Sequence, residues 1–177
     1  WQGGGTVLLS LCSPEESDPT VSTYLVDSVK ELVDPLDAEG EGIGYAPIGH
    51  TVTVESVTSE TVSFAITNLI IARSYQQTNV VAEIKTALAN AFTEKFHTKW
   101  STYDSVSFDY ISGLDLNEIE YIIMGVAGVK NIVGTITTIQ NSVPTGTNGY
   151  SVGLDARGAF KKPIFDAANT TVSFLTA

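Results

Sequence analysis

The feature that most constrains this chain is a change of hydrophobic period along residues 50–97. In residues 50–69 apolar and polar residues alternate, with the apolar positions at Val52, Val54, Val57, Val62, Phe64 and Ile66. A period of two, rich in β-branched residues, is typical of strands. We therefore expect two strands, at 50–57 and 61–69, that pair with each other through a connection at 58–60.

The next segment has the period of a helix. Its apolar residues recur at helical spacing, at Val81, Ile84, Leu88, Ala91, Phe92 and Phe96. Polar residues occupy the positions between them, at Glu83, Lys85, Asn90 and Glu94. This pattern predicts an amphipathic helix from 80 to about 97, with the apolar stripe buried.

Capping signals indicate two further helices. Asp18 precedes Pro19, which predicts an N-cap followed by the first helical position. The stripe of this helix would be Val21, Leu25, Val29, Leu32 and Leu36, with its end near Pro35. Asp115 and Glu118 have the spacing of a capping box, and that helix should break at Gly125 or Gly128.

Strands are expected at 6–11, 132–139, 150–154 and 171–175, and loops at 37–44 and 144–149. Together these elements predict an α+β fold, with helices packed on a mixed β-sheet and a β-rich C-terminal segment. We divide the chain into a flexible lead-in at 1–5, an α+β region at 6–140 and a closing segment at 141–177. Two lobes can be traced in the middle region, at 6–57 and 61–140. The aromatic residues follow the apolar faces, which places Tyr24, Phe64, Phe92, Phe96, Trp100 and Phe108 in the core.

The charge of the chain is acidic and unevenly distributed. It carries 20 Asp and Glu against 9 Lys and Arg, and residues 1–60 contain eleven of the carboxylates but only one base, Lys30. Such a field repels phosphate backbones, which argues against nucleic acid as a partner. Two interpretations of the acidic third stay open: a solvated face, or a surface matched to a basic partner.

Other bulk features exclude some classes of protein and leave others open. Apolar residues make up 43% of the chain and charged residues 16%, as in a globular fold. Cys12 is the single cysteine, so no internal disulfide is expected. No apolar run reaches membrane-spanning length and no signal peptide is visible. Because the chain begins at Trp1 and its one methionine is Met124, we interpret it as a fragment of a longer protein.

The glycine-rich segment Gly40-Glu41-Gly42-Ile43-Gly44 does not fit a phosphate-binding loop. Such a loop needs a following helix and no adjacent carboxylate, whereas Pro47 follows here and acidic residues surround the glycines. The acidic residues Asp37, Glu39 and Glu41 could instead supply oxygens to Ca²⁺, but the closing bidentate ligand of an EF-hand is absent. We expect a solvated loop.

The remaining candidates for chemistry are also weak. Cys12, His50 and His97 have no zinc-ligand spacing, and neither histidine lies in a nucleophile motif. The carboxylates Asp104 and Asp109 specify nothing by themselves. We therefore predict no catalytic, cofactor-binding or metal residues, and no enzyme.

Three local patterns resemble the J-type (baseplate J-like) wedge family of contractile phage-tail baseplates. These are Gly5-Thr6-Val7-Leu8-Leu9, the Ala46-Pro47-Ile48-Gly49 turn with the valine-rich run after it, and residues 117–132 with Val126-Ala127-Gly128-Val129. The resemblance covers about 5–139, and the expected strand at 171–175 also suits the family.

The resemblance implies a structural wedge subunit that contacts copies of itself and neighbouring baseplate proteins. It implies a virion, prophage or tail-like particle as the location, with assembly in the bacterial cytoplasm, and it carries over no catalytic or cofactor residue. The alternative is a secreted or surface carbohydrate-binding module, which the Thr- and Ser-rich strands and glycine-rich loops would also suit.

Overall fold

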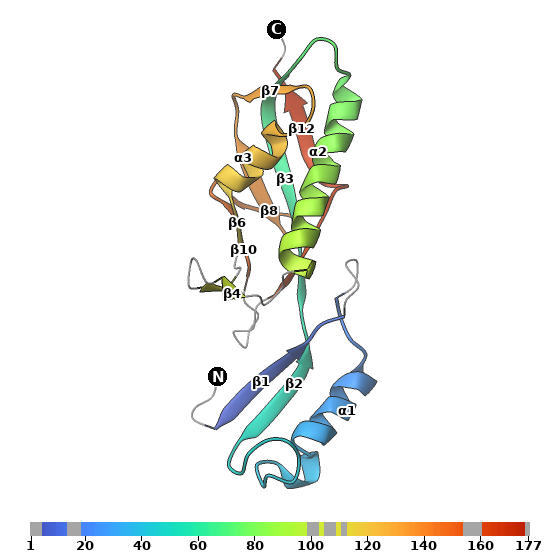
Figure 1. Ribbon diagram of the computed structural model, residues 1–177, viewed down its shortest axis with the longest axis vertical. Helices are drawn as coiled ribbons and strands as arrows, with labels where there is room; N and C mark the ends of the chain where they lie inside the picture. The colour runs from blue at the N-terminus through green and yellow to red at the C-terminus, as the bar shows by residue number, and fades with distance from the viewer. Residues whose placement is uncertain are drawn as a thin grey trace. The chain divides into compact units, whose positions relative to one another are not determined.

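The computed structural model describes residues 5–13, 19–98, 103–104, 109–110, 113–153 and 161–175 (Figure 1). The chain divides into two units. Unit 1 comprises Trp1–Ser59 and Gly153–Lys162, and unit 2 comprises Glu60–Val152 and Pro163–Ala177. No helix in the described ranges is long and apolar enough to cross a membrane.

In unit 1 a helix packs against a parallel pair of strands (Figure 1). β1 (Thr6–Leu11) pairs with β2 (Thr51–Ser56) over six consecutive positions without a register shift. Parallel strands need a long crossover connection; here the crossover contains α1 (Thr23–Val33), which contacts β2, and a short 3-10 helix, η1 (Leu36–Ala38). Unit 1 therefore contains a β-α-β arrangement, and the predicted strand at 6–11 is confirmed.

The prediction for the start and the buried face of α1 was wrong. The helix begins at Thr23 because the Ser22 hydroxyl caps it, accepting a hydrogen bond from the backbone N–H of Leu25 at 3.3 Å. Pro19 is not helical, and Asp18 lies outside the described residues. The inward face consists of Val26, Val29, Lys30 and Val33. The exposed residues instead include Tyr24, Leu25, Leu32 and Leu36. In the part of unit 1 that the structure describes, α1 packs on a sheet of two strands, and one of its two apolar faces is exposed.

Unit 2 is built around one long strand, β3 (Ser59–Ile71). Antiparallel partners of β3 are β7 (Val129–Ile132) and β8 (Ile136–Gln140), while β12 (Thr171–Phe174) pairs with it in parallel. β11 (Lys162–Phe165) also pairs with β3, and β9 (Val143–Gly146) pairs with β8. This is a mixed sheet, as predicted.

The helices of unit 2 agree with the predictions in type and position. α2 (Gln77–Phe92) continues into a π-helical turn, η2 (Thr93–Thr98). α3 (Leu116–Met124) has the predicted capping box: Asp115 accepts from the N–H of Glu118 at 2.9 Å, and Glu118 accepts from the N–H of Asp115 at 3.0 Å. α3 ends at Gly125. Two short ladders join β6 (Gly113–Asp115) to β10 (Gly149–Ser151) and β4 (Tyr103–Asp104) to β5 (Asp109–Tyr110).

The core of unit 2 lies between the two helices and the sheet. The buried stripe of α2 and η2 is Val80, Ile84, Leu88, Phe92 and Phe96. It matches the prediction except that Val80 replaces Val81 and that Ala91 is only half-buried. It packs with Ile119 and Ile123 of α3 and with the inward residues of β3. Phe64, Phe92, Phe96, Tyr150 and Phe165 form an aromatic cluster with ring centroids 5.1–6.3 Å apart. Helices thus pack on a mixed sheet, and the α+β class is confirmed.

Two predictions about strands were wrong. β2 and β3 do not pair, since β2 pairs with β1 while β3 belongs to the sheet of unit 2. The connection has no Gly or Asn that would readily adopt the positive φ of a tight hairpin turn. The strand predicted at 132–139 is two strands, β7 and β8. They are separated at Gly134, where a Cβ would lie 2.4 Å from the Thr67 carbonyl oxygen.

Candidate protein-interaction surface

Unit 1 exposes a group of large apolar side chains where α1 ends and the chain returns to β2. We call this group the loop surface, and its members are between 58% and 80% exposed: Leu32, Leu36, Ile43, Tyr45 and Ile48. Soluble proteins rarely expose several large apolar residues close together unless they bind something. The loop surface is therefore the first candidate for a functional site.

The loop that carries these residues is held by its own backbone. Gly40, Gly42 and Gly49 have positive φ angles of 76°, 73° and 82°, which glycine adopts at little cost. The N–H of Gly49 donates to the carbonyl of Gly40 at 2.7 Å, which closes the loop at its base. Pro47 accepts a backbone hydrogen bond from His50 at 3.0 Å, within the Pro-Ile-Gly turn.

The same loop is tied to the last turn of α1. The N–H of Ala46 donates to the carbonyl of Val33 at 2.8 Å, and that of Tyr45 to the carbonyl of Leu32 at 3.4 Å. A Cβ at Gly44 would lie 2.4 Å from the Val33 carbonyl oxygen, so only glycine permits this approach. These contacts hold the backbone of Tyr45 beside that of Leu32 and fix the path of the loop.

Asp34, just beyond the helix, connects three segments of unit 1. Its carboxylate accepts from the N–H of Val52 at 2.8 Å, from the N–H of Gly40 at 2.9 Å and from the ammonium of Lys30 at 2.9 Å. Lys30 also pairs with Glu39 at 2.7 Å. The hydrogen bond from Lys30, together with those from Val52 and Gly40, lowers the pKa of Asp34 to about 2. Asp34 therefore stays charged and keeps the loop attached to both α1 and β2.

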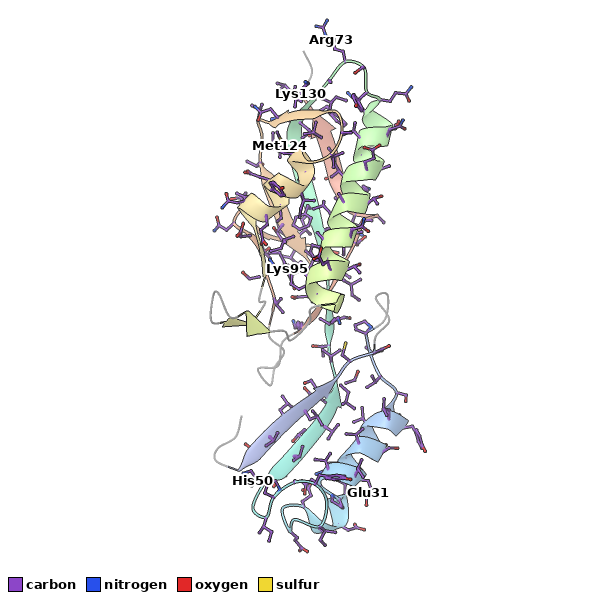
Figure 2. All side chains as sticks on the ribbon, viewed as in Figure 1. Glu31, His50, Arg73, Lys95, Met124 and Lys130 are labelled. Atoms are coloured by element: carbon purple, nitrogen blue, oxygen red, sulfur yellow. The ribbon has the colours of Figure 1, made fainter. Side chains whose placement is uncertain are left out.

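The charge around the loop surface is negative. Glu31, Asp37 and Glu41 are exposed on α1, on η1 and in the loop (Glu31 and His50 are labelled in Figure 2). The one base of this region, Lys30, is buried in its ion pairs. The arrangement suits a partner surface that combines apolar side chains with Lys or Arg.

The acidic residues considered for calcium do not converge. Glu39 pairs with Lys30, and Asp37 and Glu41 are exposed. In the described part of the chain no group of three or more His, Cys, Asp or Glu side chains could hold a metal ion. The glycine-rich segment is likewise unsuited to phosphate, because the Gly40 N–H already binds the Asp34 carboxylate and no helix follows.

The other residues considered for chemistry are placed as follows. Cys12 is half-buried, with its thiol 3.2 Å from the Ser13 carbonyl oxygen. His50 lies immediately before β2, with Nδ1 3.4 Å from the carbonyl oxygen of Ile48. The side chain of His97 lies outside the described residues. Asp104 and Asp109 are cross-strand partners in the β4–β5 ladder.

Unit 2 has a groove of about 540 Å³ between α2 and α3. Lys95 and Glu118 form an ion pair beside it at 2.7 Å, and Tyr121 lines its wall. Figure 2 labels Lys95 in η2 and Met124 at the end of α3. The carboxylates of Asp115 and Glu118 serve the helix cap. Among the described residues that line the groove, the carboxylates of Asp115 and Glu118 are therefore occupied by the helix cap and the ion pair.

Sequence reasoning missed the loop surface. The predicted solvated loop at 37–44 includes Ile43, the predicted turn includes Ile48, and no prediction concerns Tyr45. Apolar residues spaced between glycines are the signal that could have revealed this surface. It also missed the buried hydrogen bond from the Tyr150 hydroxyl to Glu60 at 2.6 Å. Burial, and secondly this bond, raise the pKa of Tyr150 well above its ordinary value.

No protein-family model fits the chain, and no curated protein matches its sequence.

Proposed function

We propose that this chain is a non-enzymatic structural subunit of a baseplate wedge, in a contractile phage tail or a related prophage or tail-like particle. The observation that carries the proposal is the loop surface, in which several large apolar side chains are exposed on a closely hydrogen-bonded loop. Exposed apolar groups held in one geometry bind partners well, because little conformational freedom is lost on association.

The resemblance to the baseplate J-like family supports the same role. The Pro-Ile-Gly turn is one of the segments that carry the resemblance, and it is also the segment that presents Ile48 and follows Tyr45. A wedge subunit needs surfaces of this kind, and it needs neither a metal nor a nucleophile. The role is therefore consistent with the clearest feature of the described surface, a group of exposed apolar side chains.

The proposed partners are neighbouring baseplate subunits and further copies of this chain. The carboxylates near the loop surface favour a neighbour with a basic contact face, because opposite charges accelerate association and exclude wrong partners. The proposed location is the virion or tail-like particle, with assembly in the bacterial cytoplasm.

Co-expression tests this proposal. The full-length protein would be expressed with the products of its neighbouring genes and captured at low and at high salt. We expect at least one neighbour to be retained at low salt and released as salt rises, because exposed charges are screened. A glycan array with the same protein tests the carbohydrate-binding alternative. Retention of no neighbour, or specific binding to a glycan, would contradict the proposal.

A further inference from the structure

The two edges of the small sheet in unit 1 differ. Among the described residues this sheet consists of β1 and β2 alone, and two strands by themselves are marginally stable. Figure 1 shows α1 on the β2 side. What covers each edge therefore decides whether the sheet can extend.

The outer edge of β2 is occupied. The N–H of Val52, which would otherwise be free at this edge, donates to the carboxylate of Asp34 at 2.8 Å. Further along, the chain before α1 crosses β2, where the N–H of Val21 donates to the Ser56 hydroxyl at 2.9 Å. Any strand added on this side would have to displace these contacts.

No strand among the described residues pairs with the outer edge of β1. Thr51 donates to the carbonyl of Gly5 at 2.8 Å, and Val57 donates to that of Leu11 at 2.7 Å. Because backbone groups point to alternate sides of a strand, the odd-numbered residues of β1 face β2. The N–H and C=O groups of Leu8 and Ser10 therefore point away from it, where no described strand pairs.

β1 also lacks the features that usually prevent pairing at an edge. Edge strands that are protected against pairing usually carry a charged side chain, a proline or a bulge. Thr6–Leu11 contains no charged residue and no proline, and its ladder with β2 is unbroken. Val7 is 39% exposed, so an apolar side chain is available to a neighbouring strand.

The charge of unit 1 indicates which strand would bind there. Its exposed carboxylates among the described residues are Asp27, Glu31, Asp37, Glu39 and Glu41. Lys30 and Lys162 are buried, and Lys161 is half-buried. This negative field attracts a basic segment and repels a second copy of the same acidic unit.

We infer that the outer edge of β1 binds an extended, basic segment of a partner protein and takes it up as a third strand. The backbone groups of Leu8 and Ser10 supply the hydrogen bonds, and the net negative charge of unit 1 favours a segment that carries Lys and Arg. This inference concerns β1 and does not depend on the assembly to which the chain belongs.

Amide hydrogen exchange measured by NMR on the whole chain tests this inference in two steps. In the free protein, the amides of Leu8 and Ser10 should exchange at least about tenfold faster than those of Val7 and Leu9, which face β2. Next, a short synthetic peptide that alternates valine and lysine is added as the probe. It should slow exchange at Leu8 and Ser10, whereas the matching valine–glutamate peptide should not.

Two substitutions at one position provide the control. Ser10→Pro removes an outward N–H while leaving the bonds to β2 in place, and should abolish the effect of the peptide. Ser10→Ala retains the N–H and should respond like the parent. If Ser10→Pro fails to fold, amide exchange in the unmodified protein, with and without the peptide, still tests the inference. The inference is overturned by slow exchange at Leu8 and Ser10 in the free protein, by protection that grows with protein concentration (a second copy), or by a valine–lysine peptide without effect there.

Discussion

The Asp34 carboxylate accepts a hydrogen bond from the backbone N–H of Val52 at 2.8 Å, which joins the end of α1 to the start of β2. The same carboxylate binds the Gly40 N–H and the ammonium of Lys30. One side chain thus fixes a helix, a loop and a strand. The stability of unit 1 and the geometry of the loop surface should both depend on it.

Replacing Asp34 by asparagine should destabilise unit 1. The change preserves the shape but leaves Lys30 with a weaker partner and removes an acceptor from Gly40 or Val52. We expect the melting temperature of unit 1 to fall by about 5 °C or more, with faster amide exchange at Gly40 and Val52. The matched control is Asp37→Asn, an exposed carboxylate of the same region, which should melt like the parent. Equal melting of the two variants would contradict the role assigned to Asp34.

The lowered pKa of Asp34 predicts a loss of stability in acid. A depressed pKa contributes stability that is fully present above the ordinary value of 3.8 and disappears as pH falls through the folded value of about 2. Urea unfolding of unit 1 should therefore become easier as pH is lowered from 4 towards 2. In Asp34→Asn this part of the pH dependence should be missing. If the free energy of unfolding depends on pH in the same way in parent and variant, groups other than Asp34 cause the loss of stability in acid.

Leu88 tests the packing of α2 on the sheet of unit 2. It is fully buried between the helices and the sheet, so Leu88→Asp should cost at least about 3 kcal/mol, because it removes apolar burial and leaves a charge in the core. Asn90→Asp introduces the same charge at an exposed position of the same helix and should change stability by less than about 0.5 kcal/mol. Denaturant unfolding measures both, and similar costs would contradict the assigned face.

The protein should require no metal ion. Glu39 is already paired with Lys30, while Asp37 and Glu41 do not converge with it on a common point. Elemental analysis should find no stoichiometric metal, and neither EDTA nor added Ca²⁺ should shift thermal melting. A rise of several degrees with Ca²⁺ would reveal a site that includes these carboxylates.

Features encoded within a few consecutive residues were predictable. The helical period of α2 and the capping box at Asp115 and Glu118 involve residues close in sequence. Both predicted features are therefore present in the structure. Strand period is equally local, and it located β1, β2 and β3. The partner of a strand is not local, however, and a period of two does not tell whether Val54 and Val62 belong to one sheet. Their separation into two sheets was therefore missed.

The loop surface could not be derived for a related reason. α1 has apolar residues on two faces, and only packing against β2 decides that Val29 is turned inward and Leu32 outward. Nor does sequence spacing show that Asp34 would reach Val52, eighteen residues further along the chain. The exposure of Tyr45 follows from the bonds that attach the loop to the end of α1, and those bonds exist only in the folded unit.

Binding of the co-expressed neighbour to variants of the loop surface tests the central claim most directly. Tyr45→Ser combined with Ile48→Ser removes two of its most exposed apolar side chains. Tyr121→Ser combined with Val143→Ser is the matched control, since these residues of unit 2 are 83% and 61% exposed. We predict at least about tenfold weaker binding of the neighbour to the loop-surface variant and unchanged binding to the control. A loop-surface variant that binds the neighbour as tightly as the parent would contradict the account.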